Sequence, residues 1–331
     1  MVRKRRPWLD PHGWTHDQLY RYLRVTRGMA KSTAECRIRY LKFLEKPRSR
    51  GGWGLNLHQD PEDAFMEFFD YVLERRDTEE DPEDALNNSQ KAVKSLFEAL
   101  GVKGDYEWVK IRRKKRDKQV YDDQTAYDII NGSYRDDPAA NATLQHIFHY
   151  GHYVGPRPSE LLTLRLSDIN WKERKIRIRE RKTRKIRTVI VEDFVINSPV
   201  DKSLWNYYTN WRPKLLERGN YEGDDFWLNG RGYPISYDWG RQQLSKAGKR
   251  TCSYFHPHLM RSFCITWRLI WSYWQTGVFD IIGVNMFVDH GSLDQTAEYT
   301  RIAERYIREW QQKPKMGRIR AGRMEGKNAS K

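Results

Sequence analysis

Two segments, HLMR at 258–261 and DHGSLDQTAEY at 289–299, decide how this sequence is interpreted. The histidine and the arginine of the first segment are three residues apart, so a helix places both on one face. In the second segment, His290 precedes Tyr299 across a Gly-Ser turn. Arginine binds phosphate oxygens in a bidentate fork, imidazoles donate to them or move protons, and a phenol can form a covalent intermediate. The order and spacing of these four side chains predict a site that binds a phosphate and attacks it.

An upstream segment, GPRPSELL at 155–162, adds a second arginine. Gly155 and Pro156 interrupt one helix and present Arg157 at the start of the next, where backbone N–H groups also favour an anion. Glu160, one turn later, is expected to hold Arg157 in place. The alternative for this pair is an ordinary surface contact between residues three apart.

These residues together resemble the tyrosine recombinase (phage integrase) family, and the resemblance runs from about Val120 to Ile302. It implies a mainly α fold with a small β-sheet, in which a helical core-binding domain precedes an α+β catalytic domain. We expect a simple integrase or an Xer-like protein without a separate arm-binding domain. The predicted segments are a basic arm (1–14), the core-binding domain (15–109), a basic linker (110–119), the catalytic domain (120–305), and a docking segment with a basic tail (306–331).

The resemblance also implies roles for the site residues. Arg157, Arg261 and His290 would bind the scissile phosphate, His258 would help to take the phenolic proton, and Tyr299 would form a 3′-phosphotyrosine link. Because the covalent link keeps the bond energy, neither ATP nor a metal is expected as a cofactor. The sequence shows no carboxylate cluster for Mg²⁺.

A general acid is predicted on a β-hairpin at 175–191, where Ile176 and Ile178 alternate with arginines. Members of the family carry a mobile lysine at this hairpin. Lys182 is the residue that we carry over to this role, and Lys185 is the competing candidate. The arginines of the hairpin, Arg179, Arg181, Arg184 and Arg187, are expected to contact phosphates.

Composition favours a nucleic acid partner. The chain has 60 Lys and Arg against 44 Asp and Glu, a net charge of +16, and a pI near 9.6. The alternative is a merely solvated basic surface. A basic stripe is expected on the helix that follows a capping-box pattern at Ser32–Glu35, and a second basic run forms the linker. The predicted DNA-binding residues there are Arg37, Arg39, Lys42, Arg112, Arg113, Lys114, Lys115 and Arg116.

Other patterns argue against metal and membrane sites. His146, His149 and His152 recur every third residue, which permits a metal site, but no carboxylate or cysteine completes it. A buried helix face is the preferred interpretation. The three cysteines lack metal-ligand spacing, which favours reduced thiols. The apolar segment 267–288 contains charged residues that make it unsuitable as a membrane span, and no signal peptide is visible.

Two features depart from the family pattern or extend it. The segment between Arg261 and His290 is longer than expected, and Val288-Asp289-His290 stands where the family usually has Leu-Gly-His. The resemblance further implies a homo-tetramer on double-stranded DNA with specific sites and with C-terminal exchange between protomers. The residues expected to dock on a neighbouring subunit are Ile302, Tyr306, Ile307 and Trp310.

The predicted function is therefore site-specific DNA recombination, with an integrase of a virus or other mobile element preferred. An Xer-type dimer resolvase and a type IB topoisomerase-like enzyme are the alternatives within this chemistry. A catalytically silent DNA-binding protein is the alternative from another class, and a metal-dependent nuclease is the last. We expect a cytoplasmic protein associated with DNA, in the host cytoplasm or nucleoid if its origin is viral.

Overall fold

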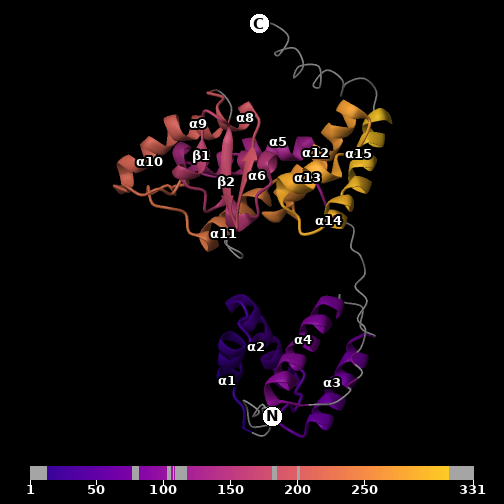
Figure 1. Cartoon of the computed structure of the whole chain (residues 1–331). Helices are drawn as coiled ribbons and strands as arrows, with labels where there is room; N and C mark the ends of the chain where they lie inside the picture. Colours follow the sequence, from indigo (N-terminus) through magenta and orange to yellow (C-terminus); the bar gives the residue numbers. More distant parts are fainter. Residues whose placement is uncertain are drawn as a thin grey trace, which may run out of the picture. The chain divides into compact units, whose positions relative to one another are not determined.

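The computed structural model describes residues 13–76, 82–102, 106, 108, 118–180, 185–199 and 202–312. The chain divides into two compact units, 1–116 and 117–331 (Figure 1). Each unit encloses its own core of buried apolar side chains. The two units are therefore considered one at a time.

The first unit is helical in its described residues. Its helices are α1 (His16–Arg21), which continues as a π-helical turn (Tyr22–Thr26), α2 (Lys31–Glu45), α3 (Pro61–Arg76) and α4 (Pro82–Leu100). Thr15 caps α1 in a capping box with Gln18, as its position in the sequence predicts. The capping box predicted at Ser32–Glu35 is wrong, because α2 begins at Lys31 after an Ala30 N-cap that makes no side-chain hydrogen bond.

The core of the first unit forms where the apolar faces of these helices meet. Leu19, Leu41, Leu44, Val93 and Leu96 are fully or almost fully buried. On α2 the buried residues recur at helical spacing, so one face packs inward and the opposite face is free for charged side chains.

The second unit contains most of the elements. In chain order they are α5 (Asp123–Asn131), α6 (Pro138–Val154), α7 (Pro158–Leu161), η3 (Leu166–Asp168), β1 (Ile169–Asn170), β2 (Lys175–Arg179), β3 (Ile186–Ile190), α8 (Asp193–Ile196), α9 (Leu204–Asn206), η4 (Tyr207–Trp211), α10 (Arg212–Gly219), α11 (Tyr237–Gly248), α12 (His258–Thr276), α13 (Ile281–Val288), α14 (Leu293–Ala297) and α15 (Thr300–Gln312). Asp225 and Leu228 take part in isolated β-bridges, with Arg165 and Pro234 respectively.

The predicted hairpin is confirmed. In the described residues, the antiparallel sheet has the strand order β1-β2-β3, and Ile176 pairs with Val189 while Arg179 pairs with Ile186. Ile176 and Ile178 are buried, whereas Arg177 between them is exposed. This alternation is the two-residue period of a strand with one face in the core.

Two central helices, α6 and α12, pack against each other and carry the core of the second unit. Asp137 caps α6 by accepting hydrogen bonds from Ala139 and Ala140, and α6 ends at Gly155. Helix α12 ends at Gly277, whose φ of 77° is the left-handed conformation that suits glycine at a helix end.

Helix α15 packs on α12 of the same chain (Figure 1). Ile302 and Ile307 are buried, and the hydroxyl of Tyr306 donates to the carbonyl of Val120 at 3.0 Å. The ring of Trp310 lies 5.0 Å from that of Trp274, nearly parallel to it. The four residues predicted to dock on a neighbouring subunit thus contact their own chain, and α15 runs across the predicted boundary at 305/306.

Candidate active site

Arg157 lies between two helices, as its sequence context predicts. Helix α6 ends at Gly155, whose φ of 64° is in the left-handed region, and an added Cβ there would lie 2.9 Å from Cys264. Glu160 accepts hydrogen bonds from the backbone N–H and from Nη1 of Arg157, both at 2.9 Å. The expected Arg157–Glu160 contact is therefore present, and it closes the first turn of α7.

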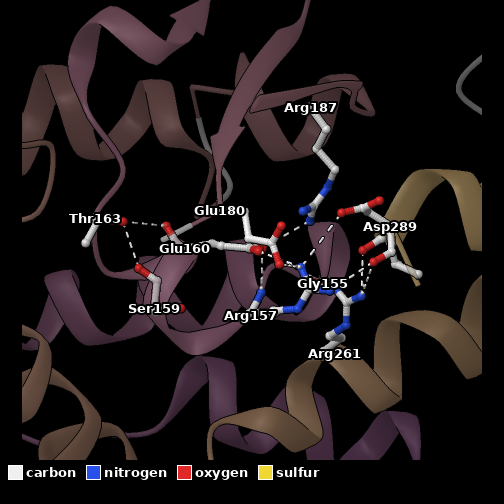
Figure 2. A network of polar contacts seen from close by, with 10 residues as sticks. Gly155, Arg157, Ser159, Glu160, Thr163, Glu180, Arg187, Arg261 and Asp289 are labelled. Carbon is white, nitrogen blue, oxygen red and sulfur yellow. Dashed lines mark hydrogen bonds and ion pairs between the residues drawn. The ribbon is translucent and has the colours of Figure 1, made fainter. Parts of the chain in front are cut away.

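Glu160 is shared between two arginines (Figure 2). Only 4% of Glu160 is exposed, and Nη2 of Arg187 on β3 donates to its Oε2 at 3.2 Å. Burial by itself raises the pKa of this carboxyl. The charge of Arg187 and the hydrogen bonds from Arg157 outweigh burial and hold the pKa of Glu160 below its ordinary value of 4.5. Glu160 is therefore ionised at neutral pH and fixes both guanidinium groups.

Arg187 was expected to contact phosphate, and without DNA present it pairs with Glu160. Its side chain is only 13% exposed and points to Glu160. Its Nε and Nη1 are buried without a hydrogen-bond partner among the described residues. Unsatisfied buried donors are costly, so these two groups mark a place where an anion would be stabilised.

Arg261 is 1% exposed and joins three chain segments (Figure 2). Its Nη1 donates to the carbonyl of Gly155 at 2.9 Å, and its Nη2 donates to the carbonyls of Val288 at 2.5 Å and Asp289 at 3.5 Å. Burial, with the nearby positive charges of Arg157 and Arg187, lowers the pKa of Arg261 to about 10. The side chain therefore stays charged at neutral pH.

The turn before His290 forms although aspartate stands where the family usually has glycine. Asp289 has a φ of 56° and a ψ of 63°, the left-handed conformation that aspartate tolerates better than most residues. Its carbonyl accepts a hydrogen bond from Nη2 of Arg157 at 3.0 Å. Both arginines therefore hold the segment that leads into His290.

A chain of hydrogen bonds orients the His290 ring. Nδ1 of His290 lies 2.8 Å from the hydroxyl of Thr296, which is fully buried and donates to Oδ1 of Asn285 at 2.9 Å. Because the hydroxyl has one proton and gives it to Asn285, it accepts from Nδ1–H. Neutral His290 then presents Nε2 as an acceptor until it takes up a second proton.

His258 occupies the first position of α12, where part of the residue is exposed and part is covered. Partial burial, followed by the charges of Arg261 and other cations, lowers the pKa of His258 to about 4. Burial and the charges of Arg261, Lys118 and Arg157 also lower the pKa of His290 to about 4. Both imidazoles are therefore neutral at pH 7, and the nearby arginines and Lys118 oppose their protonation.

Tyr299 is 4% exposed, and its hydroxyl lies 3.1 Å from the hydroxyl of Ser262. The Tyr299 and His290 rings are 6.3 Å apart and nearly parallel. The ammonium group of Lys118 lies 4.1 Å from the centre of the Tyr299 ring. Sequence reasoning missed Ser262, Thr296 and this role of Lys118, which stood in the sequence only as one more charge of a basic run.

Only one of the two candidates for the general acid lies among the described residues. Lys182 lies outside the described residues. Lys185 is exposed at the start of the return strand, and its carbonyl accepts a hydrogen bond from the N–H of Glu180 at 2.8 Å. The choice between the two lysines therefore stays open.

The predicted DNA-binding residues separate into three groups. Arg39 and Lys42 are exposed on one side of α2, whereas Arg37 is partly buried with an inaccessible Nε, so it does not share their face. Arg179 pairs with Asp168 at 2.8 Å and keeps 38% of its side chain exposed. The remaining seven lie outside the described residues and stay predictions for the linker and the hairpin tip: Arg112, Arg113, Lys114, Lys115, Arg116, Arg181 and Arg184.

The row of histidines on α6 lies in the interior. His146, His149 and His152 are 2%, 7% and 0% exposed. Across the described parts of the chain, no group of three or more histidine, cysteine, aspartate or glutamate side chains is arranged to hold a metal ion. None of the helices in those parts is both long enough and apolar enough to cross a membrane.

Comparisons with known proteins agree with this arrangement. The tyrosine recombinase XerC of Oceanobacillus iheyensis is 32% identical over 158 residues, which are 47% of this chain and 48% of XerC, so the match spans about half of that relative. A lambda integrase dimer bound to a core site is similar with a TM-score of 0.61 and 16% identity, covering 86% of this chain and 94% of the integrase. XerH bound to a palindromic difH substrate has a TM-score of 0.60 and 14% identity, covering 90% and 84%.

These likenesses to solved structures establish the two-part, mainly helical fold with a small sheet. The model of the phage integrase family matches residues 133–305, more than half of the chain and the whole stretch from α6 to Tyr299. The chain belongs to the phage integrase family.

Proposed function

We propose that this protein cleaves and rejoins DNA through a 3′-phosphotyrosine intermediate on Tyr299. The observation that carries the proposal is the cationic site built around Glu160, in which Arg157, Arg187 and Arg261 converge. Buried guanidinium donors without partners stabilise a bound phosphodiester. The candidate nucleophile, Tyr299, lies on the same segment as His290, and the rings of the two residues are 6.3 Å apart.

The reaction exchanges one phosphodiester bond for another. The phenolic oxygen of Tyr299 bonds to phosphorus, the bond from phosphorus to the 5′ oxygen breaks, and that oxygen takes up a proton. Arg157 and Arg261 stabilise the charge on the non-bridging oxygens in the transition state. Because this first step conserves one phosphodiester-type bond, attack by a 5′ hydroxyl reverses it and rejoins a strand.

Protonation states in the free protein suit these roles. His258 has a pKa near 4 and is neutral at pH 7, so it can accept the phenolic proton. His290 shares that lowered pKa, and a bound phosphate would reverse the sign of the local field and favour its protonation and donation. Lys182 or Lys185 would then supply the proton to the leaving 5′ oxygen.

The partner in this proposal is double-stranded DNA with specific sites, bound by a tetramer on two sites. C-terminal exchange would require α15 to leave α12 of its own chain and to pack on α12 of a neighbour. The protein would act in the cytoplasm, associated with DNA. The preferred biological role is integration of a mobile element, and the XerC relative supports Xer-type resolution as the second candidate.

The test is a covalent adduct on nicked DNA that traps the cleaved state. Wild-type protein should form an adduct that survives denaturation without added metal, and Tyr299→Phe should form none. Tyr306→Phe is the matched control, since Tyr306 lies on the following helix and its hydroxyl donates to the carbonyl of Val120. An undiminished adduct in Tyr299→Phe would refute the assignment. Salt-dependent binding without any adduct would favour a silent DNA-binding protein.

A further inference from the structure

The segment that carries Tyr299 is held by a lysine from the beginning of the second unit. The ammonium group of Lys118 donates to the carbonyl of Gln295 at 3.2 Å and pairs with the carboxylate of Glu298 at 2.8 Å. The same group lies 4.1 Å from the centre of the Tyr299 ring. Lys118 therefore contacts α14, the residue before the nucleophile, and the nucleophile itself.

These contacts coincide with a closed arrangement of Tyr299. The tyrosine is 4% exposed and its hydroxyl is engaged by Ser262. A phenol in this position must move before its oxygen can approach the phosphorus of a duplex. The hydroxyl bond to Ser262 and the cation on the ring face both oppose that movement.

Lys118 also lies beside the place where the phosphodiester would bind. Its charge contributes to the lowered pKa of both His258 and His290. The ion pair with Glu298 is accessible to solvent, since 32% of the Lys118 side chain and 42% of the Glu298 side chain are exposed. An arriving phosphate can therefore compete with Glu298 and with the aromatic ring for the same ammonium group.

We propose that Lys118 is a positioning residue that keeps Tyr299 closed in the free protein and releases it when the DNA phosphate attracts its ammonium group. This inference rests on the proposed function of Tyr299 as the nucleophile. It makes cleavage competence a consequence of DNA binding at the site, because the substrate itself removes the contact that restrains the nucleophile. A purely structural ion pair would stabilise the fold without responding to DNA.

The first experiment observes the closed arrangement directly. A 3-fluorotyrosine placed at position 299 of the full chain gives a ¹⁹F signal, which is recorded with and without intact duplex DNA. In the otherwise wild-type protein, DNA should shift the signal toward that of an exposed tyrosine. Lys118→Met should show the shifted signal without DNA, and Lys118→Arg, which keeps a cation on the ring, should not.

Lys214→Met is the matched control. Lys214 is exposed on α10, and its ammonium group lies 4.6 Å from the centre of the Trp211 ring, so the variant loses the same charge and the same kind of contact elsewhere in the unit. Its ¹⁹F signal should match the wild type in both conditions. A Lys118→Met signal that matches the wild type without DNA would overturn the proposal.

The second experiment weakens the closed arrangement while the Lys118 charge remains. Glu298→Gln should accelerate single-turnover adduct formation on saturating nicked DNA by about two- to fivefold, the range expected for loss of an exposed ion pair. An unchanged or slower rate would contradict release as a step. Tyr299→Phe distinguishes failure of the proposed function from failure of this inference. An adduct that persists in Tyr299→Phe refutes the proposed function. If Tyr299→Phe forms no adduct and Glu298→Gln leaves the rate unchanged, only this inference is refuted.

Discussion

Replacement of His149 by phenylalanine should remove a large part of the acid sensitivity of the second unit. His149 lies on α6, is 7% exposed, and packs against the rings of Tyr153 and Phe194. Its buried Nδ1 has no hydrogen-bond partner among the described residues. Burial, with the charges of the neighbouring histidines, lowers the pKa of His149 from 6.5 to about 3.

The sign and size follow from proton binding. Between pH 6.5 and 3, an unfolded chain holds a proton on this histidine and the folded chain does not, so lowering the pH favours unfolding. From pH 7 to pH 5, this one side chain should lower the free energy of unfolding by about 2 kcal/mol. His146 and His152, whose pKa values burial lowers to about 4, act in the same direction.

The assay is urea unfolding at pH 7 and pH 5, followed by pulsed hydrogen exchange of peptides from α6, so that the second unit is measured separately. His149→Phe should lose about 2 kcal/mol less than the wild type between the two pH values. His149→Asn removes the same titration with a polar side chain, so its pH dependence should fall equally whatever its stability at pH 7. The reasoning is refuted if both variants keep the wild-type pH dependence.

Three further predictions concern the site and the helix that follows it. Thr296→Val should slow adduct formation about tenfold, because it removes the hydroxyl that orients His290. Thr296→Ser, which keeps the hydroxyl, should react at the wild-type rate. Thr143→Val, which removes another buried hydroxyl, should leave the rate unchanged. Asp289→Gly should stabilise the second unit by about 1 kcal/mol in urea unfolding, since glycine adopts the left-handed conformation without strain. The same change removes a carboxylate from the phosphate site, so it should tighten DNA binding in a salt titration. Weaker binding would contradict this reasoning. Trp310→Ala should lower the free energy of unfolding by about 2 kcal/mol through loss of its ring contacts with Trp267 and Trp274. An unchanged value would show that these contacts do not hold α15.

Local signals in the sequence were sufficient for much of the fold. Thr15 begins α1 through contacts within a few residues. The alternation of Ile176 and Ile178 with arginines predicted the hairpin because strand geometry has a period of two. Ser32 shows that such local patterns can mislead, since a sequence that matches the capping-box pattern does not cap α2.

The candidate site was also named from local spacing. The three-residue interval between His258 and Arg261, and the glycine before Arg157, specify which side chains emerge together from a helix or a turn. They do not specify what covers those side chains. Whether Arg187 faces solvent or pairs with Glu160 depends on how β3 packs against α7. The sequence of the strand does not specify that packing.

By itself, then, the sequence predicted the identity and order of the residues that we propose bind and attack a phosphate, because that prediction depends on short intervals along one backbone. Only the tertiary structure decided that Tyr299 is buried, that Ser262 contacts its hydroxyl and that the ammonium group of Lys118 lies against its ring. Those contacts join segments that are remote in the chain. They arise from the packing of α12, α14 and the segment that contains Lys118, which no periodicity or local propensity specifies.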